Sequence, residues 1–336
     1  MTRSAQRTRT RTGAAALVLA LGLTACAPEI PTPDPEAPPV AARPVLAPEQ
    51  VKAVLADVGT ALEQASTELD RDAVDARLTG PARKIRRTEL LVAEVLETTE
   101  YVTQLPTATK SVMVSTAETW PRVVLAVSEQ PELQTERLLV LEQPSARAQY
   151  QLWAWVRLFP NVELPAFAAA ATGSAQAAAD AEGYVMTPDA AVAAYADVLS
   201  KGSKSEHAEL FADDPFRQQI AQIKKLQNEA LEAADGKQTL TFSAVPGSVR
   251  ALETVDGGVV VVGEMTALED RVAEKGATIA PGSQIEKALA RKLDVENEMS
   301  ISYTSTVALY LPAEGTDEAP VVLGVEHVAT AADIPS

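Results

Sequence analysis

The side chains that could carry acid–base chemistry lie in the last third of this sequence. His327 alternates with apolar residues along the expected strand 321–330, so its imidazole would face an apolar interior, as a buried base or a ligand contact. Tyr303 lies on the apolar face of the expected strand 299–311, and Glu264 lies in phase with the valines of the strand 259–267. A histidine, a tyrosine and a carboxylate facing one cavity could bind a small molecule or move its protons. The alternative for His327 and Tyr303 is a structural role in a packed core, and for Glu264 it is an edge position that faces solvent.

A second group of interest lies in the expected strand 149–159. Trp153, Trp155, Arg157 and Phe159 alternate with aliphatic residues, which predicts that both indoles share one face of the strand. Aromatic rings with an arginine form a stacking surface. Such a surface could pack against a neighbouring domain, bind an external partner, or hold a small ligand.

Other chemistries are disfavoured by what the sequence lacks. It contains two histidines and one cysteine, with no nucleophile-elbow serine motif, no paired-histidine zinc motif and no phosphate-binding glycine loop. Asp70, Asp72 and Asp75 lack the glycine and the terminal glutamate of a calcium loop. We therefore expect no metal and no cofactor, and a binding protein rather than an enzyme. Catalysis by carboxylates alone stays open.

The N-terminal residues carry the pattern of an export signal. Four arginines precede an apolar run of about ten residues, too short to cross a bilayer, and the run ends at Leu23-Thr24-Ala25-Cys26. This tetrapeptide resembles the lipobox of bacterial lipoproteins, which implies a diacylglycerol on the Cys26 thiol and cleavage before Cys26. An ordinary secretory signal with an incidental cysteine is the alternative. Residues 1–25 are thus expected to be a lipoprotein signal peptide.

Charge limits the partners of the exported protein. The chain has a net charge of −17, and removal of the four arginines of residues 1–25 would take it to −21. So acidic a protein does not favour nucleic acid. We expect a membrane partner through the lipid at Cys26, together with an unknown envelope protein or small ligand. The expected location is the extracytoplasmic face of the cell membrane.

Two breaks in composition divide the rest of the chain. Residues 26–47 are rich in proline, which prevents helix formation and favours an extended tether. Residues 168–183 consist mostly of alanine and other small residues, which predicts a linker, although an exposed alanine helix would also fit. The expected domains are therefore residues 48–167 and residues 184–336.

Both expected domains repeat one order of elements. Each begins with a helix started by proline, at Pro48 and at Pro188, continues with a second helix after a proline-containing turn, and ends in a series of strands. Helices followed by an antiparallel meander predict an α+β fold with helices on one sheet face. Asp256-Gly257-Gly258 predicts a hairpin turn between two of the strands.

This element order resembles the cystatin-like or nuclear-transport-factor-two-like cone, in which a curved antiparallel sheet wraps a helix, here twice in tandem. The lipobox, the proline-rich tether and the segments Thr119-Trp120-Pro121-Arg122, Leu152-Trp153-Ala154-Trp155 and Asp213-Asp214-Pro215-Phe216-Arg217 are similar to those of an uncharacterised group of lipoproteins from high-GC Gram-positive bacteria. That resemblance implies a location and no reaction.

The sequence thus predicts a lipid-anchored extracytoplasmic module that binds or assembles components of the cell envelope. The alternative is an isomerase-like pocket enzyme or small-molecule carrier, with His327, Tyr303 and Glu264 facing the cavity of the second cone. Cavity content distinguishes the two, because a cone filled by its own side chains leaves no room for a substrate.

Overall fold

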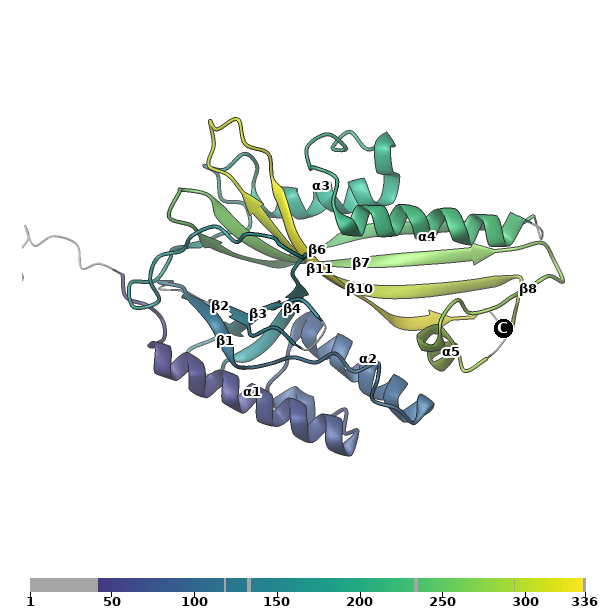
Figure 1. The fold of residues 1–336 in the computed structure, drawn as a ribbon, viewed down its shortest axis with the longest axis horizontal. Coiled ribbons are helices and arrows are strands. Elements are labelled where there is room, and N and C mark those ends of the chain that lie inside the picture. Colours follow the sequence, from purple (N-terminus) through teal and green to yellow (C-terminus); the bar gives the residue numbers. More distant parts are fainter. Residues whose placement is uncertain (1–41, 118, 132–133, 233–234, 293, 335–336) are drawn as a thin grey trace, which may run out of the picture. The chain divides into compact units, whose positions relative to one another are not determined.

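The computed structural model describes residues 42–117, 119–131, 134–232, 235–292 and 294–334 (Figure 1). The expected signal peptide, Cys26 and most of the proline-rich tether lie outside the described residues. Among the helices that are described, none combines the length and the apolar character needed to cross a membrane. Contacts group Ala42–Ser336 as one compact unit.

The first half begins with two amphipathic helices, α1 (Pro48–Glu68) and α2 (Gly80–Leu96). Pro48 occupies the first turn of α1, where its missing N–H costs no hydrogen bond, and the Gln50 side chain accepts a hydrogen bond from the Ala47 N–H at 2.8 Å. One face of α1 is buried through residues spaced three and four apart. A short 3₁₀ helix, η1 (Ala73–Ala76), joins α1 to α2.

A four-stranded antiparallel meander follows. Its strands, in sheet order, are β1 (Thr109–Val114), β2 (Arg122–Ser128), β3 (Arg137–Gln143) and β4 (Gln151–Arg157). Alternate residues of β2 enter two different cores: Val124 and Ala126 pack with α1 and α2, whereas Val123 and Leu125 pack on the opposite face. This first sheet is therefore buried on both faces, which explains why its strands are continuous apolar runs.

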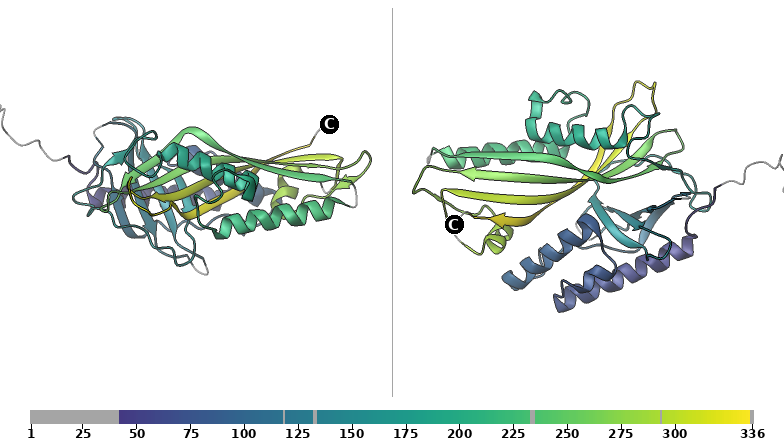
Figure 2. Two further views of the ribbon diagram at one scale, coloured as in Figure 1. Left: turned by 90° about the horizontal axis from the view of Figure 1, so that it is seen from above. Right: turned by 180° about the vertical axis from the view of Figure 1, so that it is seen from behind.

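The second half repeats the order of helices before strands. Helices α3 (Pro188–Lys201) and α4 (Pro215–Glu232), with the short η2 (Gly202–Lys204) after α3, pack on one face of a five-stranded sheet (Figure 2). The strands of this second sheet, in sheet order, are β11 (Val321–Asp333), β10 (Glu298–Leu311), β7 (Val259–Val272), β6 (Lys237–Glu253) and β5 (Gln176–Ala177). Helix α5 (Gln284–Ala290) and the two-stranded ribbon of β8 (Thr278–Ile279) and β9 (Val295–Glu296) are inserted between β7 and β10.

The two sheets pack against each other through a shared apolar layer, which we call the seam. On the first sheet it contains Leu125, Val140 and Trp153, and on the second Val260 and Val262, among other buried residues. The order of layers is thus α1 and α2, first sheet, second sheet, then α3 and α4.

Backbone contacts close one end of the seam. Leu158 forms an isolated antiparallel bridge with Gly324 of β11, and the Phe159 N–H donates to the Leu323 carbonyl at 2.9 Å. A Cβ on Gly324 would overlap the carbonyl oxygen of Arg157, so only glycine permits this approach of β11 to the end of β4.

Polar side chains protect the free edge of the second sheet. On its outer side, the start of β6 has no strand beside it in the described residues, and two of its outward N–H groups are bound by the helices instead. The Phe242 N–H donates to Ser200 Oγ of α3 at 2.7 Å, and the Gln238 N–H donates to Asn228 Oδ1 of α4 at 3.0 Å. These bonds satisfy groups that would otherwise be free to pair with another chain.

Residues 168–183 are attached to both sheets. Ser174 bridges Ser115 beside β1, and Gln176 and Ala177 form β5, which pairs with β6. No helix forms in this segment, whose residues are all described. The α+β class, the helices on one face of each sheet and the hairpin at residues 256–258 agree with the sequence-based expectation. The division into two tandem domains stays a prediction.

The close approach at Gly324 is open to a stability test. We expect Gly324→Ala to lower the free energy of unfolding by about 2 kcal/mol or more, because the new methyl group meets backbone that cannot move without opening the seam. Gly247→Ala is the control: its methyl group would lie in open space, and only the positive φ of 73° opposes it, at about 1 kcal/mol. Urea denaturation measures both, and equal losses would contradict the seam geometry.

Candidate functional site

Two of the three residues predicted to face a cavity do meet on the inner face of the second sheet. The His327 ring of β11 stacks on the Tyr303 ring of β10, with 4.4 Å between ring centroids and 12° between planes. Ser305, which lies directly across from His327 in the register, forms a hydrogen bond with His327 Nδ1 at 2.7 Å. The imidazole is thus held by both neighbouring side chains of β10.

Aromatic rings close the space around this imidazole. Phe216 of α4 and Phe242 of β6 lie edge-on and tilted to it, with ring centroids 5.3 and 5.5 Å away. Burial lowers the pKa of His327 to about 4, and the charge of Glu269 offsets only part of this shift. The imidazole is therefore neutral near pH 7 and fills the layer between α4 and the sheet.

Glu264 does not join the other two candidates. Along β7, Met265, Ala267 and Glu269 face α3 and α4, so Glu264 points to the opposite face, toward the first half of the chain. Burial raises its pKa, and the charges of Lys84 and Arg250 oppose that shift. The prediction was wrong because the valines with which Glu264 is in phase belong to the seam and not to the inner face.

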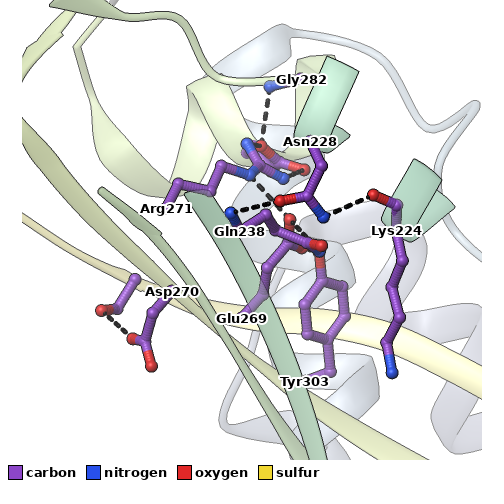
Figure 3. Close-up of polar contacts among 10 residues, drawn as sticks. Lys224, Asn228, Gln238, Glu269, Asp270, Arg271, Gly282 and Tyr303 are labelled. Atoms are coloured by element: carbon purple, nitrogen blue, oxygen red, sulfur yellow. Dashed lines mark hydrogen bonds and ion pairs between the residues drawn. The ribbon is translucent and has the colours of Figure 1, made fainter. Parts of the chain in front are cut away.

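Glu269, five residues later, is the carboxylate that Tyr303 binds. The Tyr303 hydroxyl donates to Glu269 Oε2 at 2.7 Å, and Glu269 Oε1 accepts from Arg271 Nε at 2.7 Å and from Gln238 Nε2 at 3.0 Å (Figure 3). Both carboxylate oxygens are thus occupied. Burial favours the protonated form of Glu269, but these donors outweigh burial and lower its pKa below the usual value.

The network continues from Arg271 to the inserted helix α5. Arg271 forms a two-pronged ion pair with Glu286 of α5, at 2.6 and 3.1 Å, and the Gly282 N–H donates to Glu286 Oε2 at 2.7 Å. Ser283 caps the same helix by accepting from the Glu286 N–H. The network therefore fixes α5 to β7.

This arrangement is poorly suited to proton transfer near neutral pH. Tyr303 stays protonated, because burial and the charge of Glu269 raise its pKa far above the usual value. Glu269 stays ionised and His327 stays neutral. A general acid or base works best with a pKa near the working pH, and none of the three has one.

Sequence reasoning missed Glu269 and Arg271, although a signal was present. Glu269 and Arg271 are separated by one residue, so they lie on the same face of β7, where the neighbouring inward positions are apolar. Two opposite charges on a buried face are expected to pair with each other.

The four residues of the predicted stacking surface are dispersed. In the register of β3 and β4, Leu141 pairs with Leu152 and Val140 with Ala154, so Trp153 is an extra residue at a β-bulge. The bulge reverses the alternation, which sends Trp153 into the seam and Trp155 into the core beneath α1 and α2. The expectation that both indoles share one face was wrong for this reason.

Trp153, Arg157 and Phe159 each have a partner of their own. The guanidinium of Arg250 lies 4.5 Å from the Trp153 ring centroid and is also paired with Glu142 at 2.7 Å, at the border of the seam. Phe159 packs against the core of the second half. Arg157 is largely exposed and forms an ion pair with Glu326 at 3.2 Å.

Two of the three aspartates that were compared with a calcium loop bind an arginine instead. Asp72 and Asp75 pair with Arg87 of α2 at 2.9 and 3.1 Å. Within the described part of the chain, no three His, Cys, Asp or Glu side chains are grouped so that they could hold a metal ion.

A pH titration tests the environment of His327. The unfolded imidazole takes up a proton near pH 6.5 and the folded one near pH 4, so this residue makes the protein less stable as the pH falls through that window. We expect His327→Asn, which can still bind Ser305, to remove roughly 3 kcal/mol of pH-dependent loss. His207→Asn, at the other histidine, is the control. Denaturation at several pH values measures the slopes; if the slope of His327→Asn matched that of the unaltered chain, the imidazole would be solvated.

Fluorescence quenching tests the positions of the tryptophans. Trp153 and Trp155 are 3% and 0% exposed, whereas Trp120 is 40% exposed. Acrylamide should therefore quench chiefly Trp120, and Trp120→Phe should leave a weakly quenched spectrum. Persistent strong quenching in Trp120→Phe would mean that the seam is open to solvent.

Comparison with known proteins gives a family and no activity. No curated protein and no solved structure matches the chain significantly. A family model described as a domain of unknown function (DUF8094) matches residues 42–333, a span that holds both sheets and helices α1 to α5. The chain therefore belongs to the DUF8094 family.

Proposed function

We propose that this protein is a lipid-anchored, extracytoplasmic binding or assembly module of the cell envelope, built from two cone-like halves in tandem. Its task is to hold a partner near the membrane and not to transform a substrate.

The observation that carries this proposal is that side chains fill the space around His327 in the second half. His327, Tyr303 and Glu269 are the groups that could serve an active site there, and each is engaged by other side chains. Phe216 and Phe242 occupy the space beside the imidazole. A substrate would have to displace these contacts, so a structural role for the network fits better than catalysis.

The layered arrangement supports the tandem part of the proposal. Each half places its helices on one sheet face, and the two sheets meet through the seam. A seam of this kind suits a rigid body that presents its loops and outer helices to partners.

The anchored part of the proposal rests on the sequence around Cys26. A lipid on this cysteine would hold the described residues at the membrane surface through the proline-rich tether, up to about 60 Å away at ~3 Å per residue. Two acyl chains supply a stable attachment without a spanning helix.

A pocket enzyme or small-molecule carrier is the second candidate. It is favoured by one observation, the stacked pair of His327 and Tyr303 next to an ionised carboxylate. This candidate requires α4 to move off the sheet, because Phe216 of α4 closes the pocket.

Anchoring can be tested with the thiol itself. We expect the full chain to sediment with membranes and to be released by detergent, and the mature N-terminal peptide to carry a diacylglycerol. Cys26→Ser should abolish the lipid and shift the protein to the soluble exported fraction. Thr24→Ser, which alters the same segment but keeps the thiol, is the control and should remain anchored. Sedimentation of Cys26→Ser with membranes would contradict the lipid anchor.

The binding role needs a separate test. Cross-linking in intact cells, followed by identification of the captured molecules, should recover a specific envelope component with the anchored chain and not with an unrelated lipoprotein. Turnover of a small molecule by the purified chain, lost on Tyr303→Phe, would instead favour the enzyme.

A further inference from the structure

An open polar pocket lies away from the His327 network, on the face of the first sheet that α1 and α2 cover. Its volume is about 650 Å³, within the range of small-molecule sites. It is lined by Glu100, Tyr101, Val102, Thr103, Gln130, Gln134, Thr135, Arg137 and Arg157. Hydroxyl, amide and guanidinium groups thus dominate the wall. We call it the arginine pocket.

Two arginines face each other across neighbouring strands in this pocket. Arg137 of β3 pairs directly with Arg157 of β4 in the sheet register. Like charges in directly opposed positions are destabilising, by up to about 1 kcal/mol. A site that keeps them together needs negative charge between them, and the carboxylate of Glu326 of β11 supplies one such charge.

Glu326 is shared between the two positive charges. Its Oε1 lies 3.2 Å from Arg157 Nη2, and its Oε2 lies 3.8 Å from Arg137 Nε, beyond hydrogen-bond distance. Within the described residues, Arg137 Nε and Glu326 Oε2 have no hydrogen-bond partner. The neighbouring pair of Arg86 and Glu89, at 3.3 Å, is balanced in itself. Glu100, the other carboxylate of the pocket lining, forms no ion pair with either arginine among the described residues, so Glu326 alone pairs with both guanidinium groups.

The protein holds this charge in a prepared geometry. The Arg137 side chain is 1% exposed, and its Nη1 and Nη2 donate to the Thr135 carbonyl at 2.7 Å and to Gln134 Oε1 at 2.6 Å. Arg157 is 56% exposed, and only its Nη2 contacts Glu326 among the described residues. Arg157 therefore has donors left for a ligand, while Arg137 is fixed behind it.

We propose that the arginine pocket binds a small ligand through one carboxylate, with Arg157 as the two-pronged donor and Arg137 as the fixed charge behind it. This inference rests on the proposed binding role and gives it a site and a ligand class. A carboxylate matches the guanidinium fork in shape, and its single negative charge adds to the one that Glu326 shares between the two arginines.

The other residues that line the pocket indicate which groups the rest of the ligand should carry. Tyr101, Gln130 and Thr135 offer neutral hydrogen-bonding groups, which suit the hydroxyls of a uronic acid or the amides of a peptide C-terminus. A phosphate dianion fits worse, because Glu326 and Glu100 would repel its second charge.

Ligand-observed NMR titration of the full chain in detergent tests the inference. The probes are N-acetylalanine and glucuronate as carboxylates, their uncharged counterparts N-acetylalanine amide and glucose, and inorganic phosphate. We expect at least one carboxylate to bind with a dissociation constant of about 1 mM or tighter, and its uncharged counterpart to bind at least about tenfold more weakly. Tighter binding of N-acetylalanine would indicate a peptide C-terminus as the ligand, and tighter binding of glucuronate would indicate a uronic acid.

Variants assign the binding to the pocket. Arg157→Gln should raise the dissociation constant at least about tenfold, and Arg157→Lys, which keeps the charge but loses the fork, should raise it less. Arg147→Gln, at an exposed arginine of the β3–β4 loop, is the matched control and should have no effect. Unchanged unfolding midpoints show that the variants remain folded.

The inference is overturned if no carboxylate binds, if the uncharged probes or phosphate bind as tightly, or if Arg157→Gln has no effect. Failure here with a specific partner captured in cells would leave the proposed binding role intact. Failure of both tests would remove the proposed function as well.

Discussion

Burial of both faces of the first sheet is the constraint on which the other features of this structure depend. One face packs under α1 and α2 and the other packs on the second sheet, so the sheet has no face left for water. Each polar group that reaches the border of the seam must therefore find a partner there. Arg250 with Glu142 is such a pair.

The seam also separates two environments along a single strand. Glu326 and His327 are adjacent in β11 and point to opposite faces, because side chains alternate along a strand. His327 enters the aromatic layer beneath α4, while Glu326 meets the arginines of the first half. One part of the molecule is thus closed by its own side chains, and the other keeps an open, polar pocket. The second of these environments leaves charged groups within reach of a ligand.

Much of the architecture could be predicted from local signals. Proline at the first turn and the spacing of apolar residues located α1 and α3, and the aspartate–glycine turn located the hairpin between β6 and β7. The pair of His327 and Tyr303 was also predicted, because regular alternation held through Tyr303 to Val307 and through Val325 to His327. Alternation failed at Trp153 of β4 and at Leu323 of β11, where a β-bulge inserts one extra residue into the strand. Residues on the two sides of each bulge therefore no longer follow one alternating pattern. A bulge depends on the neighbouring strand, so one strand's sequence does not reveal it.

By itself, the sequence determined the α+β class and the order of the main helices and strands, because these depend on residues close together in the chain. The tertiary structure alone decided which face each strand turns to which partner. It paired Tyr303 with Glu269 instead of Glu264, and it brought Arg137 and Arg157 to Glu326, more than 160 residues away in the case of Arg157. The physical reason is that buried charges are matched across the seam and across strands, and those distances are set by packing and not by sequence separation.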